Sequence, residues 1–303
     1  MASINDLATA ATAVSALSPP AADQQQQQPP PTPAAPTDAP AAADPAVVRG
    51  ALVVLEGLDR SGKTTQVKLL EQRFVELGRR VKVMRFPDRT TPIGQMIDGY
   101  LKSQVEMDDH VIHLLFSANR WEAAKTITAL LAAGTTVICD RYYHSGIVYS
   151  AAKRNPDLGL AWARGPEVGL PRPDLVLFLD LDEGRARARG GWGAEAYERE
   201  ETQRRVRELF WGLSLGGIGT SASVPGAEGA RRGGGGEPVA VGAATAETPV
   251  GAEVRFRQEE EDLHVVDASA SVEEVAEEVW KVVRPRVEAV ERGEVGRVVR
   301  RVM

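Results

Sequence analysis

The sequence has almost no cysteine: Cys139 is the only one among 303 residues, so no intrachain disulfide can form. This excludes a small disulfide-stapled domain and is typical of a reducing compartment. The sequence also lacks an uninterrupted apolar run long enough to span a bilayer. Basic residues are absent from positions 1–48, where a secretory or mitochondrial leader would carry them. We therefore expect no membrane association and a cytoplasmic or nuclear location.

A surplus of positive charge is missing too. Lys and Arg together number 36 against 42 Asp and Glu, which gives a net charge of −6 at pH 7. General nucleic-acid binders normally carry a basic surplus, so we expect no nucleic-acid partner. This balance still allows a local basic pocket for a small phosphorylated ligand.

Two long segments lack the residues from which a core is built. Residues 1–48 are dominated by Ala, Pro and Gln, residues 212–252 are rich in Gly, Ala, Pro and Ser, and neither segment contains an aromatic residue. Such compositions bury too little apolar surface to offset the entropy of ordering the chain. We predict a disordered tail over residues 1–48. One domain then covers residues 49–303, interrupted by a flexible insertion at about 212–252.

The remaining sequence alternates short apolar runs with helical patterns. Strands are predicted at residues 51–55, 81–85, 135–139, 175–179 and 264–266. A helix over residues 64–77 is predicted from one apolar stripe: Val67, Leu70, Phe74 and Leu77. A capping box formed by Ser271 and Glu274 begins the last helix. Strands that alternate with helices predict the α/β fold class, with a parallel five-stranded sheet flanked by helices.

Residues 57–64, with the sequence GLDRSGKT, fit the pattern G-x4-G-K-[ST] of a phosphate-binding loop. They lie between a predicted strand and a predicted helix, which is the context that this motif requires. We expect Lys63 to reach the β- and γ-phosphates of ATP and Thr64 to ligate Mg²⁺. Backbone groups that would surround the phosphates belong to Gly57, Ser61, Gly62 and Thr65.

Two charged residues inside this loop are unusual. Asp59 and Arg60 stand where many phosphate-loop proteins carry uncharged residues. Arg60 would place a second cation beside the transferring phosphoryl group, as an arginine finger does in other enzymes. The alternative is a solvated surface ion pair, which the spacing alone also allows.

A further pattern lies in the helix predicted around residues 111–121. On a helical wheel, one apolar arc, which we expect to face the core, contains Val111, Leu114, Leu115, Ala118 and Trp121. Phe116 and Arg120 lie on the opposite side, one turn apart. An aromatic ring beside an arginine suits a planar, hydrogen-bonding ligand; the alternative is a surface stack or a dimer contact.

Asp140 and Arg141 follow the third predicted strand, at the sheet edge where ligands bind in open α/β proteins. The Asp140 carboxylate could hold a Mg²⁺-bound water, and the Arg141 guanidinium could bridge two phosphorylated substrates. A structural salt bridge is the alternative interpretation of this pair.

Several segments together resemble the thymidylate kinase family. In the family's order they are VLEGLDRSGKTTQ (54–66), FPDRTTPIG (86–94), HLLFSANRWE (113–122), DRY (140–142), VGLPRPDLVLFL (168–179) and VDAS (266–269). The resemblance covers nearly all of the part expected to fold and points to the subgroup with its catalytic arginine in the phosphate loop. It implies a P-loop NTPase-type fold with a lid segment. The implied activity moves the γ-phosphate of ATP onto dTMP with Mg²⁺, for dTTP biosynthesis.

The resemblance also implies a role for individual residues. Arg89 would hold the acceptor phosphate, Phe116 and Arg120 would stack on and hydrogen-bond thymine, and Tyr149 would lie under the deoxyribose. The catalytic residues would be Arg60, Lys63, Arg141 and Asp59. The dTMP site would comprise Asp59, Phe86, Arg89, Phe116, Arg120, Arg141, Ser145, Gly146 and Tyr149. The ATP site would comprise Gly57, Arg60, Ser61, Gly62, Lys63, Thr64, Thr65 and Asp267, and Mg²⁺ would bind Thr64 and Asp140, directly or through water. Family members are usually homodimers, so a homodimer is expected.

The sequence departs from the family pattern at two positions. Ala196, in the lid-like segment 189–198, stands where relatives often carry arginine, so Arg60 would have to supply that cation. Ala270 stands where some relatives have lysine, which predicts weaker ATP binding.

Three other functions share some of these features. A kinase of another nucleotide, such as a UMP/CMP or deoxynucleoside kinase, is separated only by a substrate panel. A GTPase switch requires Asn-Lys-x-Asp, whereas no asparagine of this chain precedes a lysine. A pseudokinase is disfavoured by the intact Lys63, Thr64, Asp140 and Arg141.

Overall fold

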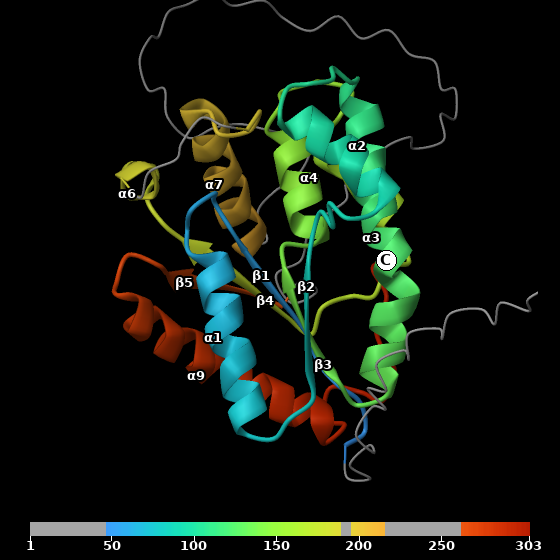
Figure 1. Cartoon of the computed structure of the whole chain (residues 1–303), viewed down its shortest axis with the longest axis vertical. Helices are drawn as coiled ribbons and strands as arrows, with labels where there is room; N and C mark the ends of the chain where they lie inside the picture. The colour runs from blue at the N-terminus through green and yellow to red at the C-terminus, as the bar shows by residue number, and fades with distance from the viewer. Residues whose placement is uncertain (1–46, 189–194, 216–261) are drawn as a thin grey trace, which may run out of the picture. The chain divides into compact units, whose positions relative to one another are not determined.

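The computed structural model describes residues 47–188, 195–215 and 262–303. Five strands form one parallel sheet in the order β2-β3-β1-β4-β5 (Figure 1). They are β1 (Leu52–Gly57), β2 (Val81–Arg85), β3 (Thr136–Asp140), β4 (Leu175–Asp180) and β5 (Leu263–Asp267). The α/β fold class is therefore confirmed, and each predicted strand ends within two residues of its observed limits.

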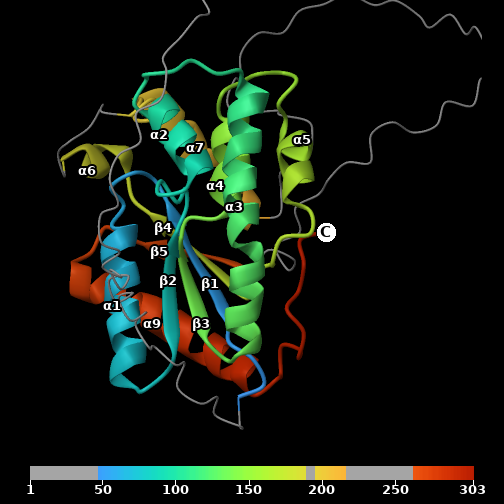
Figure 2. The same cartoon turned by 45° about the vertical axis from the view of Figure 1, so that its right-hand side comes forward.

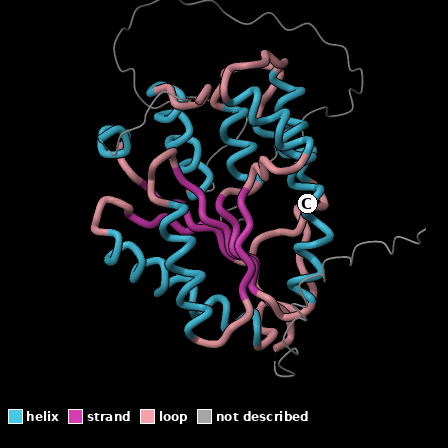
Figure 3. Tube along the Cα trace, in the orientation of Figure 1, coloured by secondary structure: helices cyan, strands magenta, loops and turns pink. Residues whose placement is uncertain are grey.

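Helices cover both faces of the sheet, as Figure 3 shows with the strands in magenta. The helices α1 (Lys63–Glu76) and α9 (Val272–Glu291) pack on one face. The helices α3 (Asp109–Ala132), α4 (Tyr143–Ala151) and α7 (Glu200–Ser214) pack on the other. Within β1, Leu52 and Val54 belong to one core cluster, whereas Val53 and Leu55 belong to the other. Both faces of β1 are buried, which explains its continuous apolar run.

The shorter helices lie near the carboxyl ends of the strands. They are α2 (Pro92–Leu101), α5 (Leu160–Arg164), the 3₁₀ helix Gly165–Glu167 and α6 (Glu183–Ala188). Figure 2 shows α2 beyond the strand ends, with the long helix α3 running alongside the sheet. In the ranges that the structure describes, no helix combines the length and hydropathy needed to cross a membrane.

The helix ends agree with their sequence signals, with one exception. Ser271 and Glu274 form the predicted capping box of α9, and Gly78, after α1, has a φ of +68° that suits glycine. Val67, Leu70 and Phe74 are buried as expected. Leu77 belongs to the same predicted stripe but is 56% exposed, because α1 ends at Glu76 and the chain turns away from the core.

The limits of the folded domain differ slightly from the prediction. Val48 N–H already donates to the Glu291 carbonyl, so ordered contacts begin before residue 49. The insertion was predicted to begin at about 212, but α7 continues to Ser214 and Leu213 is buried against the core. Residues 1–46 of the predicted tail and 216–252 of the predicted insertion lie outside the described ranges.

The face of α3 that contacts the core was predicted wrongly. Val111, Leu114 and Trp121 from the apolar arc are 48%, 47% and 42% exposed. The buried face carries Ile112, His113, Ser117, Asn119, Arg120, Ala124, Ile127 and Leu131. Half of these side chains are polar, and distant segments supply their hydrogen-bond partners. A helical wheel cannot anticipate such partners, so it assigned the polar side to the surface.

Candidate active site

Two adjoining cavities open where the carboxyl ends of β1, β2 and β3 meet the amino end of α1. The first, which we call the phosphate-loop cavity, has a volume of about 450 Å³ and is lined by residues 59–66 and by the segment that begins α9. The second, the aromatic cavity, has a volume of about 260 Å³. Its walls come from the β2–α2 connection, α3, α4 and residues 195–198. The position at the carboxyl ends of parallel strands is where ligands bind in open α/β sheets.

The phosphate loop, residues 57–64, requires glycine at both ends. Gly57 has a φ of +150°, and a Cβ there would lie 2.6 Å from Ser61 Oγ and 2.7 Å from the Leu179 carbonyl oxygen. Gly62 is the N-cap residue of α1, with a φ of +98°, and has no side chain to bond the first N–H groups of the helix. Those N–H groups and the helix dipole can therefore bind an anion.

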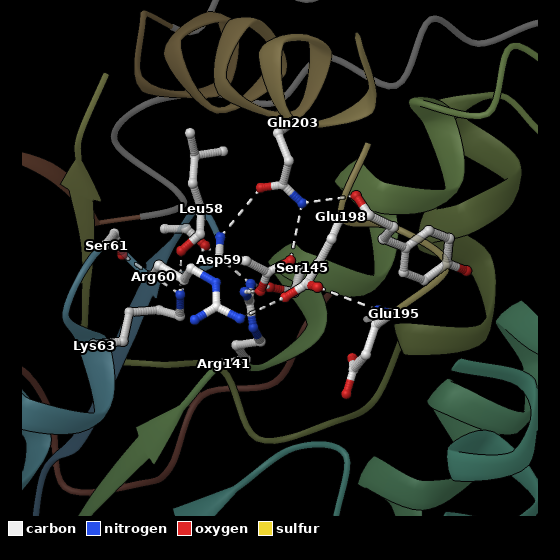
Figure 4. A network of polar contacts seen from close by, with 12 residues as sticks. Leu58, Asp59, Arg60, Ser61, Lys63, Arg141, Ser145, Glu195, Glu198 and Gln203 are labelled. Atoms are coloured by element: carbon white, nitrogen blue, oxygen red, sulfur yellow. Dashed lines mark hydrogen bonds and ion pairs between the residues drawn. The ribbon is translucent and has the colours of Figure 1, made fainter. Parts of the chain in front are cut away.

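Lys63 is folded back onto this loop. Its ammonium donates to the carbonyl oxygens of Gly57 and Leu58, at 3.1 and 2.5 Å (Figure 4). Burial, with the nearby Arg141 as the next cause, lowers the pKa of Lys63 to about 7. A phosphate in the cavity would be a charged acceptor and would favour the protonated form.

Thr64 and Asp140 together offer oxygen atoms to a metal ion. The Thr64 hydroxyl donates to Asp140 Oδ2 at 2.6 Å, and both residues line the phosphate-loop cavity. A hydroxyl and a carboxylate are ligand types that Mg²⁺ prefers. The chemistry of these donors therefore fits the ion that the sequence predicted there.

The Arg141 guanidinium is held by three acceptors within the site. It donates to the Gly57 carbonyl at 3.0 Å, to Ser145 Oγ at 2.9 Å and to Asp59 Oδ1 at 2.5 Å. Burial opposes the charge, but Tyr149 and Asp59 raise the pKa of Arg141 above its ordinary value. The residue has a φ of +68°, and this backbone turn directs the side chain over the strand ends toward the loop.

The buried carboxylate of Glu56 fixes this turn. It is fully buried at the end of β1 and accepts from the backbone N–H groups of Tyr142 and Ser145 at 2.9 and 3.1 Å. The Ser145 hydroxyl donates to its second oxygen. Glu56 thus joins β1 to the start of α4 and positions Arg141, although sequence analysis had not assigned it a role. A charged residue inside an otherwise apolar strand was the available signal.

Asp59 connects the loop to α7. Its carboxylate accepts from Arg141 and from Gln203 Nε2 at 2.9 Å, and its backbone N–H donates to Gln203 Oε1 at 3.1 Å. In Figure 4, Gln203 points from α7 toward Asp59. Burial opposes ionisation, but Arg141 and Lys63 hold the pKa of Asp59 below its usual value. An ionised carboxylate already paired in this way is a positioning group and a weak base.

Arg60 lies between the two cavities and lines both. Its φ of +66° places the residue in the left-handed region, and its guanidinium lies 3.4 Å from Glu198 in an ion pair. The side chain is 30% exposed, which leaves it accessible from both cavities. This location is the one that a cation between two nucleotides would need.

The aromatic cavity contains most of the residues predicted for dTMP. Eight of the nine line it, namely Asp59, Phe86, Arg89, Phe116, Arg141, Ser145, Gly146 and Tyr149. Four further residues line it that the sequence pattern had not indicated: Ser150, Glu195, Tyr197 and Glu198. The last three belong to the lid-like segment. The composition of this segment gave no signal beyond the position of Ala196.

Arg89 is neutralised by two carboxylates. Its guanidinium donates to Asp98 and Glu195, each at 2.7 Å. Burial opposes the charge, but Glu195 and Asp98 raise the pKa of Arg89. A bound phosphate would therefore compete with Glu195 for the same donors.

Arg120 is the predicted dTMP residue that does not line the aromatic cavity. Its side chain is 2% exposed and makes a bidentate ion pair with Glu167, which is fully buried. The guanidinium lies directly behind Gly146, where any side chain would collide with it: a Cβ on Gly146 would be 2.6 Å from Arg120 Nη2 and 3.0 Å from Nη1. Because Gly146 has no side chain, only its backbone lies between Arg120 and the aromatic cavity. The hydrogen bond from Arg120 to thymine stays a prediction.

Most of the residues predicted for ATP line the phosphate-loop cavity, and two of them do not. Six of the eight line the phosphate-loop cavity: Arg60, Ser61, Gly62, Lys63, Thr64 and Thr65. Gly57 lies behind the loop, and the Asp267 carboxylate accepts from the Ser269 N–H at 2.8 Å. Neither residue lines this cavity, whose far wall comes instead from Ala268, Ala270, Val272 and Val275.

Comparison with known proteins gives a consistent family. A family model described as thymidylate kinase matches residues 55–214. A thymidylate kinase of Arabidopsis thaliana is 51% identical over 162 residues, which are 54% of this chain and 60% of the relative. One of Danio rerio is 49% identical over 162 residues, covering 54% of this chain and 76% of the relative.

A solved thymidylate kinase from Candida albicans has the same fold. It superposes with a TM-score of 0.59 and 31% sequence identity, covering 78% of this chain and 92% of the other. The family model spans just over half of the chain and includes the phosphate loop, all the residues that line the aromatic cavity, most of those that line the phosphate-loop cavity, and α7. On these grounds, the chain belongs to the thymidylate kinase family.

Proposed function

We propose that the protein binds ATP in the phosphate-loop cavity and dTMP in the aromatic cavity. The family reaction transfers the γ-phosphate of ATP to dTMP and gives dTDP and ADP. The observation that carries the proposal is the junction of the two cavities, where both are lined by Asp59, Arg60 and Arg141. In-line transfer requires the two phosphates to meet between cations, and this junction provides that arrangement.

Each residue has a distinct part in this proposal. Lys63 leaves the loop carbonyls and binds the β- and γ-phosphates, while Arg60 and Arg141 stabilise the charge on the transferring group. Arg89 exchanges Glu195 for the acceptor phosphate. Asp59 holds Arg141 and orients the acceptor. Its lowered pKa makes it a weak base, so we give it no proton to accept.

We propose that Thr64 and Asp140 hold the Mg²⁺ that accompanies ATP, directly or through water. The ion supplies positive charge that neutralises the phosphate oxygens during transfer. The short hydrogen bond between Thr64 and Asp140 keeps both oxygens on one side of the cavity, which supports this assignment.

A coupled assay of ADP release with a panel of nucleoside monophosphates tests the substrate. We expect dTMP to give the highest kcat/KM among dTMP, dUMP, UMP, CMP, dCMP and dGMP. The panel is broad because the solved Candida albicans relative is described as having broad substrate specificity. ATP hydrolysis without an acceptor is the control. A higher kcat/KM for a ribonucleotide than for dTMP would contradict the proposal.

We also propose that the protein forms a homodimer through the exposed face of α3. Val111, Leu114 and Trp121 follow one another at helical spacing on this face, and the neighbouring Val168 is 49% exposed. A contiguous exposed apolar face is typical of an interface. Sedimentation equilibrium should give a dimer mass for the wild type, and Leu114→Glu should give a monomer. A wild-type monomer at micromolar concentration would contradict this assembly.

We propose a cytoplasmic or nuclear location and no nucleic-acid partner. A buried free thiol at Cys139 and the net charge of −6 support these two assignments. Fluorescence microscopy of the tagged full chain tests the first, and a filter-binding assay with DNA and RNA tests the second.

A further inference from the structure

One residue at the junction of the two cavities has no role in the proposed mechanism. Four residues line both cavities: Asp59, Arg60, Arg85 and Arg141. Three of them were expected from the sequence, and the fourth, Arg85, was not. A side chain that lines both cavities can reach the point where the phosphates of two bound nucleotides meet.

The backbone of Arg85 is fixed by the sheet. Arg85 is the last residue of β2 and is paired in register with Asp140 of β3. The next residue, Phe86, donates its N–H to the Asp140 carbonyl at 3.0 Å, so the strand is held up to its end. The side chain therefore starts from a rigid position at the carboxyl edge of the sheet.

The guanidinium of Arg85, by contrast, is held among the described residues only by a long ion pair with Asp140. Its side chain is 64% exposed, and Nε lies 3.9 Å from Asp140 Oδ2, too far for a hydrogen bond. In the part of the chain that the structure describes, the Arg85 side chain makes no hydrogen bond. Arg141 and Arg89 differ, because their donors are already engaged by protein oxygens.

The charges at the junction favour a further contact between a cation and the phosphates. Of the two carboxylates nearest the junction, Asp59 is paired with Arg141. Asp140 accepts a hydrogen bond from Thr64 and lies at ion-pair distance from Arg85. Two nucleotides would bring several negative phosphate oxygens into the same space, and a guanidinium with free donors can bind two of them at once.

We propose that Arg85 is a further catalytic residue, which donates hydrogen bonds to the phosphoryl group in transfer. The inference rests on the proposed phosphoryl transfer. In that step, the bond between the γ-phosphorus and the β–γ bridging oxygen breaks, and a dTMP phosphate oxygen bonds to the same phosphorus. Arg85 forms and breaks no covalent bond. It stabilises the charge on the oxygens of the transferring group, and this contribution is felt mainly in kcat.

The test compares Arg85→Ala and Arg85→Lys with Lys82→Ala. Lys82 is an exposed cation of the same strand that lines neither cavity. We expect Arg85→Ala to lower kcat about 10- to 150-fold, the range for a lost hydrogen bond to a charged group. KM for ATP and for dTMP should change less than about threefold. Arg85→Lys should recover part of kcat, and Lys82→Ala should match the wild type.

A bisubstrate probe, in which a phosphate chain joins thymidine to adenosine, provides a second readout. Arg85→Ala should weaken its binding about tenfold or more, while binding of ADP or dTMP alone changes little. The same variant should keep the wild-type Tm, because an exposed side chain without hydrogen bonds contributes little to folding.

Two outcomes would overturn the inference. The first is an unchanged kcat in Arg85→Ala. The second is a loss confined to kcat/KM that disappears at high salt, which would show that Arg85 only attracts anionic substrates at long range. A wild-type enzyme without dTMP turnover would instead contradict the proposed function.

Discussion

The two halves of the site are built in different ways. The phosphate-loop cavity takes most of its wall from one continuous segment, residues 59–66, whereas the aromatic cavity draws on β2–α2, α3, α4 and the lid-like segment. In the first cavity, the groups available to an anion are Lys63 and the backbone N–H groups that begin α1, with Arg60 and Arg141 at the junction. In the second, Arg89 lines the wall and is already held by protein carboxylates.

The two halves also differ in the groups that hold their cations before an anion binds. Lys63 is held by neutral carbonyl oxygens, which a phosphate displaces with a gain of charge pairing. Arg89 and Arg120 are held by the carboxylates of Glu195 and Glu167, so they are neutralised before any ligand binds. The two cavities share the Asp59–Arg141 ion pair, and the aromatic cavity depends on further ion pairs between segments that are far apart in the sequence.

The largest effect is expected where the aromatic half depends on a buried ion pair. Glu167→Gln leaves the Arg120 guanidinium buried without its counter-charge, and breaking a pair in this way costs roughly 3–5 kcal/mol of folding free energy. Urea unfolding measures it. The matched variant is Arg120→Met/Glu167→Gln, which removes both charges and should recover part of the loss. Equal destabilisation in the single and double variants would show that the pair is not the cause.

The second largest effect is expected from a variant that changes only the phosphate-loop half. Lys63→Ala should lower kcat by about 10²- to 10³-fold, because its cation stabilises charge that develops in transfer. Lys68→Ala removes an exposed lysine from the same helix and serves as the control. If kcat stayed near the wild-type value while only KM for ATP rose, Lys63 would contribute uniform binding alone.

The third effect is a dependence of stability on pH, and it comes from a buried histidine behind the aromatic cavity. Burial, with Arg120 as the next cause, lowers the pKa of His113 from 6.5 to about 4. The unfolded chain then binds a proton at higher pH than the native chain, so stability falls as pH drops from about 6.5 to about 4, by roughly 3 kcal/mol.

Urea unfolding between pH 4 and pH 7 measures this loss, and His113→Gln should lack it. An NMR titration gives the pKa of His113 directly. A His113 resonance that titrates near 6.5 in the native protein would contradict the expected loss.

The smallest of the four effects concerns the cation between the halves. Arg60→Ala should lower kcat about 10- to 100-fold, as expected for one lost hydrogen bond to a charged group. Arg204→Ala, an exposed arginine on α7, is the control. Full activity of Arg60→Ala would show that another cation of the site stabilises the transferring group. The Arg85 variants would then test whether Arg85 is that cation.

Most of the fold could be predicted because its signals are local. The apolar runs located all five strands, and the glycine-rich loop and the Ser271 capping box located the starts of α1 and α9. The face of α3 could not be predicted, because its buried polar residues are satisfied by partners far along the chain. His113, for example, bonds Ser150, and Arg120 bonds Glu167.

The spacing of about ten residues was sufficient to predict the phosphate loop and the positions of Lys63 and Thr64 within it. Which carboxylate each arginine contacts followed from the packing of segments that are distant in the sequence. This packing also brought Glu56, Arg85 and Gln203 to the site, from β1, β2 and α7. Backbone geometry is set by residues that are neighbours in the sequence, whereas ion pairs and cavity walls depend on where the whole sheet and its helices pack.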